Sequence, residues 1–149
     1  MKGTLFLALG CVAYRLGSVR LGAIAGLGQR MPWTMAAFLV GALSLIGIPL
    51  TAGFVSKWYL TLAAVERGWW PLVVVVVAGS LLAIIYVWRV VEMAYLRSPP
   101  EKLSVTEAPL SLLLPTWLLA GANVYFGIDT RFSVGMARQA AALLTGSSG

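Results

Sequence analysis

The chain has 149 residues, of which 60% are hydrophobic and 11% are charged. A soluble domain carries about a quarter charged residues, so this composition predicts a membrane protein. The formal net charge is +6, from 11 Lys and Arg against 5 Asp and Glu. Because the basic residues are scattered along loops and helix ends and form no stripe, they indicate contact with anionic lipid head groups, and no nucleic acid partner is expected.

Missing residue types restrict the chemistry of the chain. There is no His and one Cys, Cys11, so the commonest metal ligand is absent, and a disulfide or a cysteine-ligated iron–sulfur cluster cannot form within the chain. No phosphate-binding or dinucleotide-binding glycine motif occurs. We therefore expect no cofactor, no metal and no redox or hydrolytic site in this chain, which leaves open whether it is a subunit of an enzyme.

The apolar segments predict an all-α, polytopic transmembrane helix bundle of about five spans in a single membrane domain, 1–149. The first segment, 3–15, is short for a span, because crossing the hydrocarbon takes about 20 residues, so a truncated helix is expected there. A signal peptide is the alternative for this segment, but the sequence after it is again apolar, whereas a signal peptide precedes a soluble protein. A basic, glycine-containing loop follows.

A helix break is expected near Pro49. As one helix, residues 33–66 would be about 50 Å long, well beyond a hydrocarbon core of about 30 Å. Two short spans, 33–48 and 51–66, fit better, and Gly47, Pro49 and Gly53 mark the break between them.

Two more spans complete the bundle. Residues 71–97 follow an interfacial turn, "ERGWWP", whose tryptophans suit the head-group level, and end before a Ser-Pro-Pro stop signal. Residues 109–128 form the last span, and 129–149 a tail with a short amphipathic helix. With five spans, the arginine-containing loop before residue 32 and the loop with Arg67 lie on one side of the membrane, which the positive-inside rule makes cytoplasmic.

Lys57 is the polar residue that most needs an explanation. A charge at the bilayer centre costs a few kcal/mol on insertion scales, and Lys57 lies far from both Pro49 and Glu66 in the sequence. Gly53 and Thr61 share its helix face and form a small, partly polar surface. Since a break also frees backbone carbonyls, which at this depth must face protein or water, we expect a hydratable pocket in which Lys57 gains and loses a proton. Extension of the side chain to the interface is the structural alternative.

Lys2 is a second candidate, at the start of the truncated helix. From the residues alone, it is best explained as a charge beside the amino terminus.

Several motifs resemble one family. The segment "MPWTMAAFLVGALSLIGIPLTAGFVSKWYL" resembles the late helices of the antiporter-like membrane subunits shared by proton-pumping NADH:quinone oxidoreductase (respiratory complex I) and Mrp-type cation/proton antiporters. The opening "MKGTLFLALG" resembles an earlier helix of the family, and "YVWRVVEMAYLR" extends the resemblance to about residue 100.

The resemblance implies roles for both lysines. Lys57 is the lysine of the Gly-Phe-x-x-Lys motif, which lies at a break in a membrane helix and belongs to a chain of charged residues that carry protons. Lys2 corresponds to the lysine of the earlier helix, with a proton-relay role as well. Some members have an acid directly after the motif lysine, whereas this chain has Trp58, so no role for an adjacent carboxylate is implied.

The resemblance also implies a function and partners. It predicts a proton-translocating subunit in the inner (plasma) membrane, associated with the lipid bilayer and with other membrane subunits of a complex. It covers only the C-terminal part of the family's sequences, so a fragment or one piece of a split subunit is expected. Complex I types N, M and L and the Mrp D type stay open, as do an Na⁺/H⁺ antiporter subunit without redox chemistry and a purely structural membrane subunit.

Overall fold

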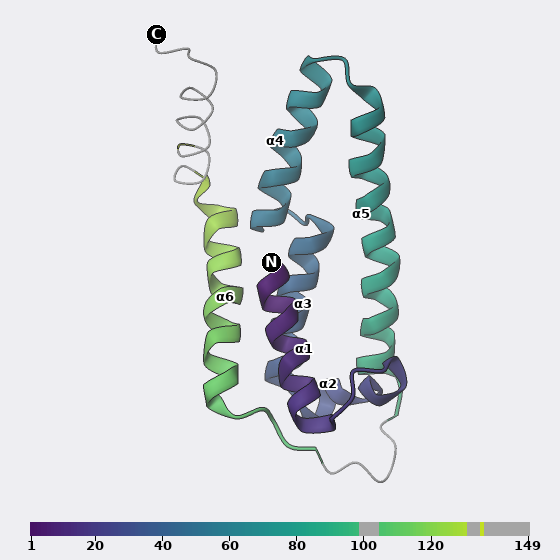
Figure 1. Ribbon diagram of the computed structural model, residues 1–149, viewed down its shortest axis with the longest axis vertical. Helices are drawn as coiled ribbons and strands as arrows, with labels where there is room; N and C mark the ends of the chain where they lie inside the picture. Colours follow the sequence, from purple (N-terminus) through teal and green to yellow (C-terminus); the bar gives the residue numbers. More distant parts are fainter. Residues whose placement is uncertain (99–104, 131–134, 136–149) are drawn as a thin grey trace.

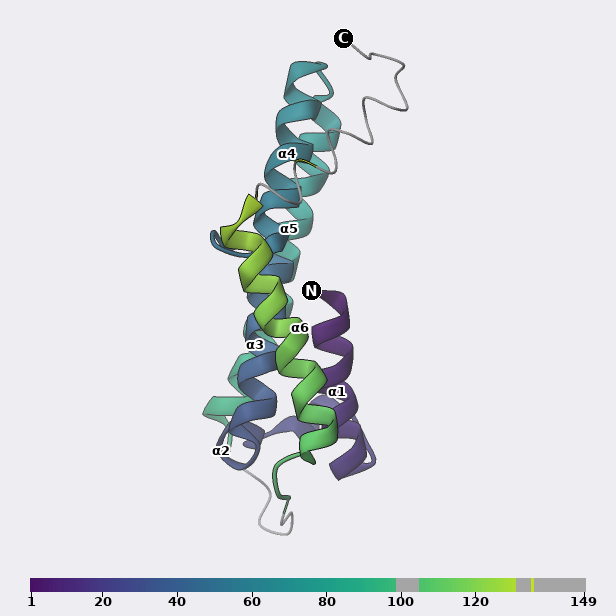
Figure 2. The same cartoon turned by 90° about the vertical axis from the view of Figure 1, so that its left-hand side faces the viewer.

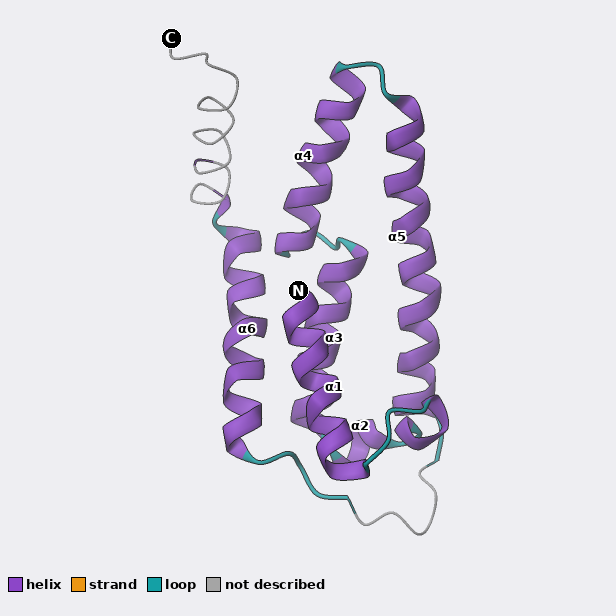
Figure 3. Ribbon diagram, in the orientation of Figure 1, coloured by secondary structure: helices purple, strands orange, loops and turns teal. Residues whose placement is uncertain are grey.

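The computed structural model of this chain describes residues 1–98, 105–130 and 135. Almost all of the predicted tail, 129–149, lies outside these residues. Every regular element in the described part is helical, without a strand (Figure 3). The long helices are α1 (Lys2–Leu16), α3 (Pro32–Ile46), α4 (Ala52–Glu66), α5 (Trp70–Val91) and α6 (Leu110–Ile128). The short ones are a 3₁₀ turn η1 (Leu21–Ile24), α2 (Leu27–Arg30) and a π-helical extension of α5, η2 (Glu92–Leu96). The predicted all-α fold class is confirmed.

Helices α3 and α4 follow each other in the same direction, one above the other, rather than forming a hairpin (Figures 1 and 2). The long helix α5 runs antiparallel to both, and α1 and α6 lie beside α3 (Figure 1). The connection from α1 to α3 and the turn from α4 to α5 therefore lie at opposite ends of the molecule. The expectation that the arginines of these two loops share one side of the membrane is thus wrong, because the break interrupts a helix without reversing the chain.

Among the residues that the structure describes, two helical segments are long and apolar enough to cross a membrane, Trp70–Leu96 and Leu110–Ile128, and Pro32–Ile46 is a shorter apolar helix. Few side chains of α5 are buried inside the molecule. Its exposed large apolar side chains include Val74, Val77, Leu81, Ile85 and Trp88. Such a surface suits lipid or another membrane helix and would not suit water.

The core lies where α1 and α3 meet the C-terminal part of α5, which contributes Val87 and Val90. Its fully or almost fully buried members are mostly small or medium-sized, including Ala8, Cys11, Val12, Met35, Ala42, Val87 and Val90. Small side chains allow close approach of membrane helices, which is how such bundles gain van der Waals contact.

Glu107 joins three helices at the end of the molecule where α3 begins. Its carboxylate accepts hydrogen bonds from the backbone N–H groups of Trp33 (3.0 Å) and Thr34 (3.3 Å), and from the Thr34 hydroxyl. Arg15, in the last turn of α1, donates to the Glu107 backbone carbonyl at 2.6 Å. A carboxylate at a helix N-terminus satisfies N–H groups that have no partner within the helix and complements the helix dipole.

We expect Glu107→Ala to destabilise the protein by about 1–3 kcal/mol, because the buried Thr34 hydroxyl and three backbone N–H groups, those of Trp33, Thr34 and Ala108, lose their acceptor. The contact with Arg15 uses the backbone and survives this change. Thermal unfolding of the purified protein in detergent measures the effect, with Glu66→Ala, an exposed carboxylate at the end of α4, as the control. Equal unfolding temperatures for the two variants would contradict the capping role.

Candidate functional site

The site is built on the interruption between α3 and α4, residues 47–51. Helix α3 ends at Ile46, and Gly47 follows with φ +93°, a left-handed conformation that glycine adopts without steric cost. Leu50 also has a positive φ, 74°, which is rare for a residue with a side chain. Pro49 lies between them, so the predicted break near Pro49 is present.

The Lys57 side chain returns from α4 to the end of α3. Its Nζ donates to the backbone carbonyl oxygens of Leu45 (2.8 Å) and Ile46 (2.9 Å), and to the Ser80 hydroxyl on α5 (2.8 Å). An ammonium group has three N–H donors, and these three acceptors use all of them. The carbonyls that the break releases from helical pairing thus bind a cation, which the negative end of the α3 dipole also favours. Lys57 is half-buried.

Gly53 allows α4 to pass directly against the last turn of α3. A Cβ atom at this position would lie 1.8 Å from the Ser44 carbonyl oxygen, so only glycine fits without movement of the backbone. The Gly53 N–H donates to the Ser44 hydroxyl (3.2 Å), which in turn donates to the Asn123 side-chain oxygen on α6 (3.0 Å). Helices α3, α4 and α6 are therefore fastened together beside the break, on polar groups that are buried.

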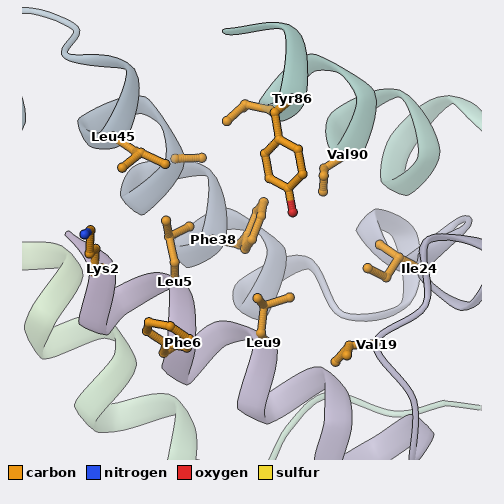
Figure 4. A pocket seen from close by; sticks show the side chains of 12 residues that line it. Lys2, Leu5, Phe6, Leu9, Val19, Ile24, Phe38, Leu45, Tyr86 and Val90 are labelled. Carbon is orange, nitrogen blue, oxygen red and sulfur yellow. The ribbon is translucent and has the colours of Figure 1, made fainter. Parts of the chain in front are cut away.

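Two adjoining hollows share Leu45, in the last turn of α3, as a wall residue. Lys57, Gly79 and other residues line one of about 550 Å³, and Lys2 lies at the edge of another, of about 560 Å³, between α1, α3 and α5 (Figure 4). Leu45 and Tyr86 belong to the walls of both, so the two lysines occupy adjoining spaces. Both linings are mainly apolar, with the two ammonium groups as their cationic members.

Lys2 itself is exposed, and Figure 4 shows it on the first turn of α1, near Leu5. The structure thus gives Lys57 three defined acceptors and places Lys2 at the wall of a neighbouring space. The relay role of each lysine stays a prediction. The described residues contain no group of three or more His, Cys, Asp or Glu side chains that could hold a metal ion.

Sequence reasoning did not assign functions to Ser44, Ser80 and Asn123. Ser80 carries a usable signal, because its small hydroxyl side chain stands beside Gly79 among the large apolar side chains of 72–88. A hydroxyl or amide within an apolar span needs a hydrogen-bond partner. This requirement could have pointed to these three residues as partners of Lys57 or of the backbone at the break.

These features define a class of protein: a bundle of apolar helices in which an interrupted helix binds a lysine through its freed carbonyls. The family described as NADH:quinone oxidoreductase/Mrp antiporter, TM, matches residues 1–83. This match covers more than half of the chain and includes α1, the break, Lys57 and Ser80. The chain belongs to this family, as the resemblance of its motifs indicated.

The relatives support the same assignment. The chain is 44% identical over 141 residues to NADH-quinone oxidoreductase subunit N of Desulforudis audaxviator, an alignment that covers 86% of this chain and 28% of that protein. It is 33% identical over 144 residues to subunit N 2 of Syntrophobacter fumaroxidans, covering 97% of this chain and 30% of the relative. The chain thus spans less than a third of the length of these curated relatives.

Two solved structures share the arrangement of helices. A chain of the Mrp complex from Dietzia sp. superposes with a TM-score of 0.86 at 24% identity, over 95% of this chain and 34% of that chain. A chain of the membrane-bound sulfane sulfur reductase, an archaeal respiratory membrane complex, superposes with a TM-score of 0.78 at 37% identity. That superposition covers 85% of this chain and 21% of the other chain. The fold is therefore that of a membrane subunit from multisubunit complexes.

We expect Gly53→Ala to destabilise the bundle by about 3 kcal/mol or more, since the added methyl group overlaps the backbone of α3. Gly79→Ala on α5 is the matched control, because its Cβ would have no atom within 4 Å, and alanine favours a helix over glycine by up to about 1 kcal/mol. The two variants should therefore change the unfolding temperature in opposite directions. Tolerance of Gly53→Ala without loss of stability would show that α3 and α4 do not approach so closely.

Proposed function

We propose that this chain is the C-terminal, ion-translocating portion of a proton-translocating membrane subunit, with Lys57 as a proton-relay residue. The observation that carries the proposal is the binding of the Lys57 ammonium by Leu45 O, Ile46 O and Ser80 Oγ at an interrupted helix. A lysine used only for solubility would extend to the membrane surface, whereas this one turns inward to the break. Family membership supports the same function.

The relay step needs a site that accepts a proton and releases it again. The charged form of Lys57 is stabilised by carbonyl oxygens and by the end of the α3 dipole, and a hollow lies directly beside it. Lys2 lines the adjoining hollow, with Tyr86 and Leu45 in the wall between them. We propose that protons pass along this line of spaces, with Lys2 as a second relay group.

The proposed setting is a multisubunit complex in the inner (plasma) membrane of the cell, with other membrane subunits as partners. The relatives named above are NADH-quinone oxidoreductase subunits N, and the similar folds come from multisubunit membrane complexes. The 44% identity to a subunit N, against 24% to the Mrp chain, favours a redox-linked complex. In that setting the redox chemistry belongs to other subunits.

An Na⁺/H⁺ antiporter subunit without redox chemistry is the second candidate, because the Mrp chain covers 95% of this chain at a TM-score of 0.86. The two differ in their dependence on sodium. Proton uptake that is driven by NADH oxidation and unchanged when K⁺ replaces Na⁺ supports the first candidate, and proton movement that requires an Na⁺ gradient supports the second.

Substitution of Lys57 tests the relay. In membrane vesicles that contain the complete complex, we expect both Lys57→Met and Lys57→Arg to lower the rate of proton pumping by about tenfold or more, as is typical when a proton-transfer group is removed. Arginine keeps the positive charge and the donors but cannot be deprotonated in a protein, so it separates a relay from a structural cation. A pH-sensitive dye measures pumping, and the amount of assembled complex is the control.

A structural role predicts a different pattern. If Lys57 only fastens α4 to α3, Lys57→Arg pumps normally and Lys57→Met fails through loss of assembled complex. Normal pumping by the arginine variant would contradict the relay.

A further inference from the structure

The three acceptors of Lys57 are chemically unequal. The carbonyl oxygens of Leu45 and Ile46 can only accept hydrogen bonds. The Ser80 hydroxyl accepts from Lys57 at 2.8 Å and at the same time donates to the Val76 carbonyl, one turn earlier in α5, at 3.1 Å. Ser80 is therefore the one partner among the three whose hydrogen bond with Lys57 can be reversed.

Loss of a proton changes what Lys57 needs from its surroundings. A neutral amine has two N–H donors and one lone pair, whereas the ammonium has three donors and no lone pair. Two donors still serve the carbonyl oxygens of Leu45 and Ile46, but the lone pair needs a donor. An unmatched polar atom in an apolar environment costs free energy, and the carbonyls cannot supply a hydrogen.

Ser80 can supply it by rotation of its hydroxyl group. At 2.8 Å the Ser80 Oγ and Lys57 Nζ are within hydrogen-bonding distance whichever atom donates. When the hydroxyl turns away from Val76, the Val76 carbonyl keeps its ordinary backbone bond within α5. The exchange thus needs no movement of a backbone or of the lysine chain.

We infer that Ser80 is a positioning residue that reverses its hydrogen bond with Lys57, so that the lysine stays at the break in both its charged and its neutral form. This inference rests on the proposed relay function and adds the group that makes both states tolerable at one place. Without the Ser80 hydroxyl, the two remaining partners of Lys57 cannot donate to the lone pair of the neutral amine, and the ammonium loses its third acceptor.

Threonine and valine at position 80 form a matched pair, because the two side chains have nearly the same shape and differ by the hydroxyl. In the complete complex, we expect Ser80→Thr to pump protons at close to the native rate. We expect Ser80→Val to lower the pumping rate by about tenfold or more, since a hydrogen bond to a charged group is lost. Gly121→Ala on α6, whose Cβ would have no atom within 4 Å and which lines neither hollow, should leave the rate unchanged. The amount of assembled complex is measured for every variant, and Ser80→Ala, which is smaller than serine, replaces Ser80→Val if valine prevents assembly.

The pattern of outcomes separates this inference from the proposed function. Equal pumping by the threonine and hydroxyl-free variants, together with loss of pumping in Lys57→Met and Lys57→Arg, would overturn the role of Ser80 and leave the relay in place. Normal pumping by Lys57→Arg overturns both. Near-native pumping by Ser80→Thr together with slow pumping by Ser80→Val, when both complexes assemble, supports the reversible hydrogen bond. A role in packing alone would affect the two variants alike.

Discussion

Backbone carbonyls released from a helix in an apolar medium must find another donor, and this constraint organises the molecule. Where α3 stops at Ile46, its last carbonyls have no partner within the helix. The ammonium of Lys57 provides that partner, from the helix that continues beyond the break. The same interruption therefore creates the need for a cation and the place that holds it, so that the position of the Lys57 charge and the stability of the fold depend on one set of hydrogen bonds.

The neighbours of the break make this arrangement specific. Gly53 brings α4 into contact with the α3 backbone, Ser44 links it to Asn123 of α6, and Gly127 of α6 lies against the backbone of residues 50 and 51. These contacts fix where the second half of the interrupted helix begins. The starting point of α4 determines the distance from the Lys57 Nζ to the carbonyl oxygens at the end of α3. The small residues Gly53, Ser44 and Gly127 therefore position the lysine without a hydrogen bond to its ammonium group.

Periodic apolar runs with Gly and Pro at their ends were sufficient to predict an all-α bundle and a break near Pro49, because both depend on local backbone chemistry. The direction of the chain after the break was predicted wrongly, since direction depends on the positive φ angles of Gly47 and Leu50 and on contacts with α5 and α6. Lys57 stood out as an isolated charge in an apolar run. Its partner Ser80 is 23 positions away in the sequence, and a pairing of that kind appears only when the helices are placed side by side. For the same reason Glu107, which caps a helix 73 or 74 residues distant, was not singled out.

The continuity of α5 has a mechanical consequence. It is an uninterrupted rod alongside a helix made of two pieces (Figure 1), and it contacts both α3 and α4. At the lower end, Glu107 ties α1, α3 and the start of α6 into one block, whereas α4 and the upper part of α5 extend beyond that block as a hairpin. A lateral force on the hairpin is thus carried to the block by α5 and concentrated on the short joint at 47–51, where the lysine is attached. Strain applied at the far end of the hairpin would therefore arrive at Lys57 as a change in the length of a few hydrogen bonds.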